Sequence, residues 1–142
     1  MADFKVVLND PKTGKSYQRE IKDPISRKFI GLKIGDMVKG EIIDLTGYEF
    51  QITGGSDYAG FPMRKDVEGS ARKKILAVQG VGLKKKAKGI KQRKLVAGNT
   101  IHAKIAQINL KIMEEGKQPL GGEKAEEKKG EKPKEEKKET KT

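Results

Sequence analysis

Apolar and polar residues alternate along much of the first part of the chain, which is the pattern of half-buried β-strands. Phe4, Val6 and Leu8 alternate with Lys5 and Asn9, and turn-forming residues separate this run from a second alternating run. We therefore expect an antiparallel hairpin of about 3–9 against 16–22. Similar patterns predict three further strands, at 37–45, 48–53 and 73–79.

The longest strand pattern covers residues 100–113 and contains a change of phase. Two groups of apolar residues point inward in different phases: Ile101, Ala103 and Ile105, then Ile108, Leu110 and Ile112. The slip lies near Ala106 and Gln107, where a β-bulge or a sharp bend would produce it. Both features are common where a small sheet closes on itself.

One short helix is predicted at about 24–30. Asp23 is suited to the N-cap and Pro24 to the first helical position, because Asp accepts from free amides and Pro has none. Gly31 is suited to end the helix in a left-handed conformation. The fold class is therefore predicted to be mainly β: a small closed or partly open antiparallel β-barrel with one short helix.

The chain divides into a domain, residues 1–120, and a tail, residues 121–142. The tail alternates Glu and Lys in short blocks and has no aliphatic residue larger than Ala125. Such a segment cannot bury enough surface to offset its ordering entropy, so we expect it to be disordered. About 120 residues remain, enough for one small domain with a modest core.

Positive charge is concentrated in residues 64–94, which we call the basic segment. The chain has a formal net charge of +12, yet residues 1–63 carry nine cations and nine acids. The basic segment has only two acids and has twelve cations: Arg64, Lys65, Arg72, Lys73, Lys74, Lys84, Lys85, Lys86, Lys88, Lys91, Arg93 and Lys94. Such a block repels itself in a compact fold unless a polyanion neutralises it.

Nucleic acid is the expected partner of the basic segment. Lys and Arg neutralise phosphates, and the release of condensed counterions supplies affinity. A solubilising surface would mix Glu with Lys, as the tail does and the basic segment does not. No aromatic residue follows Phe61, so we expect the segment to hold phosphates and RNA shape without base stacking or sequence readout.

Residues that the chain lacks argue against several classes of site. Without Cys, disulfides and thiolate metal sites are excluded, and a single His102 leaves too few groups for a metal site or a nucleophile–base pair. We expect His102 to be an exposed strand residue, or alternatively an RNA contact. The longest apolar run, 75–78, is too short to span a bilayer, and the N-terminus lacks the apolar run of a signal peptide. We expect no catalytic residue, cofactor, metal, membrane or small-molecule substrate.

A glycine-rich stretch, which we call the signature loop, lies at 54–63. Its glycines, Gly54, Gly55 and Gly60, suggest positive φ angles or close approach of another backbone. Asp57 is expected to cap loop amides or, alternatively, to bind a cation.

From this loop onward the sequence resembles the archaeal and eukaryotic type of small-subunit ribosomal protein six. The resemblance is carried by 52–63, 92–98 and 105–112, and extends more loosely over 4–120. By this resemblance the signature residues are Gly54, Gly55, Asp57, Gly60, Phe61, Pro62 and Met63, and the cations of the basic segment are the RNA-binding residues.

The resemblance also implies a location and partners. It implies a small β-barrel in the cytoplasmic ribosome, bound to small-subunit ribosomal RNA beside neighbouring ribosomal proteins, and contributing to assembly and translation without catalysis. Eukaryotic members carry a long C-terminal helix with kinase-target serines, whereas this chain has a Lys/Glu tail without serine after residue 120. Kinase regulation is therefore not carried over, and the short form looks archaeal.

Two other functions stay open. A free single-stranded RNA-binding barrel, of the RNA chaperone type, would need exposed aromatic rings as stacking platforms. The only plausible set is Tyr48, Phe50, Tyr58 and Phe61, of which we expect at least Tyr48 and Phe50 to lie in the core. A DNA-compacting protein is the third reading.

Overall fold

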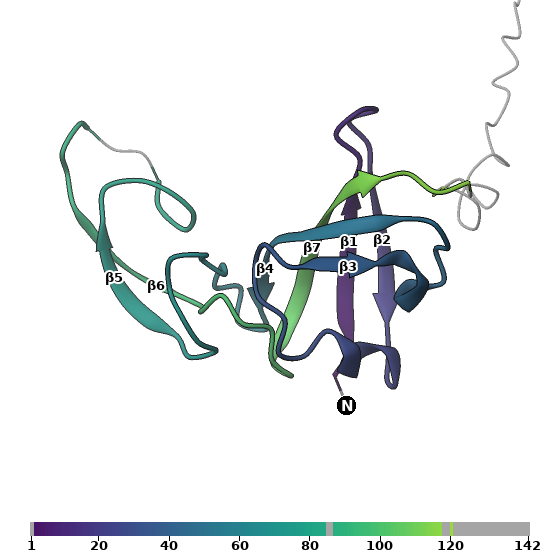
Figure 1. Ribbon diagram of the computed structural model, residues 1–142. Helices are drawn as coiled ribbons and strands as arrows, with labels where there is room; N and C mark the ends of the chain where they lie inside the picture. The colour runs from purple at the N-terminus through teal and green to yellow at the C-terminus, as the bar shows by residue number, and fades with distance from the viewer. Residues whose placement is uncertain (1, 85–86, 118–119, 121–142) are drawn as a thin grey trace, which may run out of the picture.

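A computed structural model describes residues 2–84, 87–117 and 120 of the chain. Its strands form a five-stranded sheet in the order β2-β1-β7-β4-β3 and a separate hairpin of β5 and β6 (Figure 1). The elements are β1 (Phe4–Asn9), β2 (Ser16–Ile21), η1 (Ile25–Lys28), β3 (Met37–Lys39), η2 (Gly40–Ile43), β4 (Glu49–Asp57), β5 (Lys73–Ala77), β6 (Gln92–Val96) and β7 (Ile105–Glu114). The two η elements are single 3-10 turns.

The predicted N-terminal hairpin is confirmed. β1 pairs antiparallel with β2, from Phe4 opposite Ile21 to Asn9 opposite Ser16. Asp10 stabilises the connecting turn, because its carboxylate accepts hydrogen bonds from the Thr13 hydroxyl at 2.6 Å and the Lys12 amide at 2.9 Å. These two bonds, that of Thr13 first, lower the pKa of Asp10.

The larger sheet is mixed, not antiparallel throughout. β7 lies between β1 and β4: it pairs parallel with β1 on one side and antiparallel with β4 on the other. β2 and β3 are edge strands, and the described residues do not close into a barrel. The mainly β prediction is confirmed, but the predicted closed or partly open antiparallel barrel is not found among the described residues. Alternation shows that a strand has one buried face; it does not show which strand lies beside it.

The phase slip predicted near Ala106 and Gln107 is confirmed as a β-bulge. Ser56 pairs with Gln107, and the next residue, Asp57, pairs with Ile105. Ala106 is therefore an extra residue on β7, which returns the apolar side chains on either side of it to the buried face.

The strand predicted at 100–113 begins too early, because β7 starts at Ile105. The residues before it form an irregular connection with a turn. Ile101 is buried there as predicted, but Ala103 is exposed. The alternation of apolar residues at this point arises from one core side chain in a loop and does not mark a strand.

The predicted helix at 24–30 is reduced to the 3-10 turn η1. The Asp23 carboxylate does not cap its amides; it accepts a hydrogen bond from the Ser26 hydroxyl, which is the main cause of the lowered pKa of Asp23. Gly31, at φ +94°, lies three residues after the last residue of η1, Lys28. One turn offers too few hydrogen bonds to sustain an α-helix.

The strand predicted at 37–45 is also shorter, since β3 ends at Lys39 and η2 begins at Gly40. A Cβ atom on Gly40 would lie 2.2 Å from the carbonyl oxygen of Leu45 and 2.8 Å from the Cβ of Tyr48. Only glycine permits this close turn, and it ends the strand.

The three central strands of the larger sheet, β1, β4 and β7, supply nine of the nineteen buried core side chains among the described residues. As predicted, Tyr48 and Phe50 belong to the core, with their rings stacked at 5.7 Å between centroids. Met63 and Ala97 also pack there, so the chain segments on either side of the β5–β6 hairpin are fixed to the core.

Close contact between β4 and β7 leads to a test of stability. A Cβ atom on Gly55 would lie 2.2 Å from the carbonyl oxygen of Gln107. We expect Gly55→Ala to lower the free energy of unfolding by about 2 kcal/mol, measured by denaturant titration. The neighbouring Gly54 has open space around the same position, so Gly54→Ala should be neutral or stabilising by up to about 1 kcal/mol. Equal losses in both variants would contradict the packing described.

Candidate nucleic-acid interface

The β5–β6 hairpin projects away from the five-stranded sheet (Figure 1). Its strands pair antiparallel from Lys73 opposite Val96 to Ala77 opposite Gln92. The strand predicted at 73–79 is confirmed as β5. Four glycines among lysines predict an exposed loop at 80–98, but β6 lies within that range. A two-stranded sheet is marginally stable alone in water, so this hairpin depends on contacts at its base.

Ten of the twelve predicted RNA-binding cations lie in the described part of the chain, whereas Lys85 and Lys86 fall outside it. Eight of the ten are exposed: Lys65, Lys73, Lys74, Lys84, Lys88, Lys91, Arg93 and Lys94. The strand pairing distributes four of them over both faces of the hairpin, with Lys73 and Lys94 on one face and Lys74 and Arg93 on the other. No acid lies between Glu68 and Glu114 to offset them.

Arg72, which precedes β5, anchors the hairpin to β4. Its Nε donates a hydrogen bond to the Asp57 carboxylate at 2.6 Å, and Asp57 is buried. The guanidinium carbon also lies 4.7 Å from the ring centroid of Tyr58 and 4.9 Å from that of Phe61, distances at which a cation is attracted to an aromatic face. Asp57 first, and then Tyr58, raises the pKa of Arg72.

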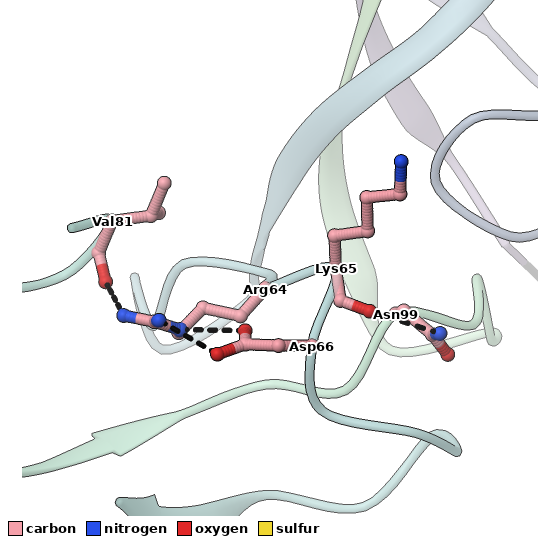
Figure 2. A network of polar contacts seen from close by, with 5 residues as sticks. All are labelled: Arg64, Lys65, Asp66, Val81 and Asn99. Atoms are coloured by element: carbon pink, nitrogen blue, oxygen red, sulfur yellow. Dashed lines mark hydrogen bonds and ion pairs between the residues drawn. The ribbon is translucent and has the colours of Figure 1, made fainter. Parts of the chain in front are cut away.

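Arg64 forms a second anchor, to the turn that follows β5 (Figure 2). Its Nε and Nη2 donate to the two carboxylate oxygens of Asp66 at 2.8 Å and 2.7 Å, and its Nη1 donates to the Val81 carbonyl at 3.0 Å. The bidentate contact raises the pKa of Arg64 and lowers that of Asp66. Gly80, at φ +124°, passes beside the guanidinium, where a Cβ atom would lie 3.1 Å from Nη1.

Asn99 forms the third anchor, where the chain returns from the hairpin. The side chain is buried, and its Nδ2 donates to the Lys65 carbonyl at 3.4 Å (Figure 2). Its Oδ1 accepts from the Gly69 amide at 3.3 Å. The backbone N–H of Asn99 also donates to the Val67 carbonyl at 2.8 Å. These bonds hold the stretch before β5 against the stretch after β6.

The signature loop proves to be partly strand, because Gly54, Gly55 and Asp57 lie in β4. Two glycine predictions are confirmed: Gly60 has φ +84°, and Gly55 faces the close backbone described above. Gly54 has neither property. As expected, the Asp57 carboxylate accepts from a loop amide, that of Tyr58, at 2.6 Å, and the cation that it binds is the guanidinium of Arg72.

His102 is not the exposed strand residue that was predicted. It precedes β7 and is half-buried, and its Nδ1 is buried without a hydrogen-bond partner among the described residues. It lines a shallow hollow together with Asp57, Tyr58, Ser70, Ala71, Arg72, Ala103 and Lys104. Within residues 2–84, 87–117 and 120, no three His, Asp or Glu side chains are grouped to hold a metal ion. None of the helical turns described has the length and apolarity needed to cross a membrane.

Sequence reasoning missed the difference between anchoring and exposed cations. Arg64 and Arg72 are the only cations of the basic segment that form ion pairs in the described part of the chain. A signal for Arg64 was present, because Asp66 is one of only two acids in the segment and lies two residues away. The partner of Arg72 lies fifteen residues away on another strand, and no local pattern indicates it.

Comparison with known sequences assigns the chain to a family. The family model of ribosomal protein S6e matches residues 4–124. The chain belongs to the ribosomal protein S6e family. Membership confirms the stated resemblance and the predictions of a ribosomal, non-enzymatic protein that acts in translation on cytoplasmic ribosomes.

Several S6e proteins, each named small ribosomal subunit protein eS6, are similar over most of their length. That of Methanococcus maripaludis is 50% identical over 120 residues, which cover 84% of this chain and 94% of the relative. That of Archaeoglobus fulgidus is 46% identical over 119 residues, covering 83% and 92%. That of Methanocella arvoryzae is 45% identical over 120 residues, covering 84% of each.

The Arg72 anchor predicts a loss of stability that the exposed cations should not share. Arg72→Ala leaves the buried Asp57 carboxylate without its cationic partner, so the free energy of unfolding should fall by clearly more than for an exposed cation. Arg93→Ala removes an exposed cation of the same hairpin and should change it by less than about 0.5 kcal/mol. Denaturant titration of both variants measures the difference, and equal effects would argue against the anchor.

The Arg64–Asp66 pair predicts a dependence on pH. Because the pKa of folded Asp66 lies below its ordinary 3.8, the stabilisation by the pair is present above that pH and is lost as the pH falls through the folded value. The wild-type protein should therefore unfold at higher denaturant concentration than Asp66→Asn at neutral pH, and the gap should vanish in strong acid. A gap that does not change with pH would show that the pair contributes nothing.

Proposed function

We propose that the protein is a structural constituent of the small ribosomal subunit and that the basic segment binds ribosomal RNA through phosphate contacts. The relatives are named for that subunit, which supports the assembly. The RNA contact rests on one observation: eight exposed cations lie on and beside a projecting hairpin that has no acid of its own.

Electrostatics favours a polyanionic partner for this hairpin. Cations on neighbouring strands repel one another, and phosphate groups that replace small counterions remove the repulsion and gain entropy from their release. The charges lie on both faces, so the hairpin is suited to sit between two RNA strands or helices. This arrangement recognises the backbone and shape of RNA, not its sequence.

In this proposal, the residues that hold the hairpin in place differ from the residues that contact RNA. Arg64, Arg72 and the buried Asn99 hold the base of the hairpin within the protein, which lowers the conformational cost of RNA binding. The exposed lysines and Arg93 then make the contacts, together with Lys85 and Lys86. Residues 1–120 act as the ribosomal domain, and neighbouring ribosomal proteins are the further partners.

The free single-stranded RNA-binding alternative has less support. It needs several exposed rings, and Tyr48 and Phe50 are 6% and 0% exposed. The two remaining rings, Tyr58 and Phe61, both contact Arg72. Only Tyr58 of the four is in the exposed class, so a row of several exposed stacking platforms is not present among the described residues.

Salt dependence tests the proposal. If about eight cations contact phosphates, the logarithm of affinity for small-subunit ribosomal RNA should fall with the logarithm of salt concentration at a slope of about −6. Replacing Lys73, Lys74, Arg93 and Lys94 by Ala should weaken binding and reduce the slope by about 3, similarly for different RNA sequences.

The matched control removes four exposed cations that lie outside the basic segment. Replacing Lys15, Lys22, Lys28 and Lys39 by Ala changes the net charge equally and should leave the slope nearly unchanged. A wild-type slope near −1, or equal effects of the two sets, would overturn the proposal.

A further inference from the structure

Tyr58 is an exposed aromatic side chain beside the basic hairpin. It is 64% exposed, and no other aromatic residue in the described part of the chain falls in the exposed class. Its position is next to the interface, because Arg72, over which its ring lies, directly precedes Lys73 and Lys74 of β5. An exposed ring at this place needs a physical explanation.

Tyr58 is fixed through its backbone amide and through one contact of its ring. The backbone amide of Tyr58 donates to the Asp57 carboxylate at 2.6 Å and to the Lys104 carbonyl at 3.1 Å. Arg72 lies over the ring and is itself fixed by Asp57. Because these contacts order the ring when the protein folds, a ligand that stacks on it has less conformational entropy to remove on binding.

The residues that line the shallow hollow beside Tyr58 include four with polar side chains besides Asp57 and Tyr58: Ser70, Arg72, His102 and the exposed Lys104. Its one acid, Asp57, is buried and already paired with Arg72. A ring at the edge and positive donors within suit a group with one flat apolar part and one anionic part.

We propose that Tyr58 stacks an unpaired nucleobase of the bound RNA, and that the hollow beside it takes the phosphate of that nucleotide through Lys104. The inference rests on the proposed function, because it adds a base contact to an RNA held by phosphates. The base contact would lie outside the basic segment, on Tyr58 of the signature loop, so the basic segment itself would still bind without base stacking. Every base has a π face, so stacking here tolerates different sequences.

Fluorescence tests the base contact directly. The chain contains no Trp, so Tyr58→Trp places a single indole at the stacking position and keeps an aromatic ring there. Saturating oligoadenylate should quench the indole fluorescence of the full-length variant, whereas an abasic ribose-phosphate oligomer of equal length should not. Equal quenching by both oligomers, or none by bound oligoadenylate, would overturn the inference.

Affinity provides the second measurement. Tyr58→Leu keeps bulk but removes the ring, and it should weaken oligoadenylate binding by roughly 5- to 150-fold, the range for loss of one stacked base. Tyr58→Phe should bind like the wild-type protein, and the salt slope should be the same for all three. Unfolding midpoints show whether Tyr58→Leu still folds; if it does not, the fluorescence result decides alone.

The two proposals fail in different ways. Absence of steep, salt-dependent RNA binding by the wild-type protein would remove the proposed function. A normal salt slope with equal affinities for Tyr58→Leu and Tyr58→Phe would keep that function and remove only the stacked base.

Discussion

The buried carboxylate of Asp57 must be paired, and the arginine that pairs it is the link between sheet and hairpin. Asp57 ends β4 in the five-stranded sheet, and Arg72 precedes β5 in the hairpin. A charge taken out of water is costly unless a partner compensates it. The position of the hairpin is therefore tied to the core, although its own two strands bury little surface.

Residue type separates the two roles within the basic segment. Both anchoring cations are arginines, whose planar guanidinium groups can bind a carboxylate and face an aromatic ring or a backbone carbonyl at once. Seven of the eight exposed cations are lysines, which act as mobile point charges suited to phosphates in varied positions. The segment thus combines a rigid base with an adaptable charged surface.

Local patterns allowed the sequence to predict much of the sheet. The N-terminal hairpin, the buried Tyr48 and Phe50 and the bulge at Ala106 follow from alternation, because burial of one face leaves a mark at every second residue. The parallel pairing of β1 with β7 left no such mark, since it joins the two ends of the domain. β6 was missed because its apolar residues, Leu95 and Val96, are adjacent in a run of cations. The hollow at Tyr58 brings together three separate stretches of chain, which only the fold places side by side.

The central claim is that the exposed cations of the hairpin lie against RNA in the assembled small subunit. Chemical acetylation of lysines, read by mass spectrometry on the free protein and on small subunits that contain it, tests this most directly. The account predicts strong protection of Lys73, Lys74, Lys88, Lys91 and Lys94 in the subunit. If these lysines stayed as reactive as in the free protein while lysines elsewhere on the chain became protected, RNA would lie against another surface and the account would be wrong.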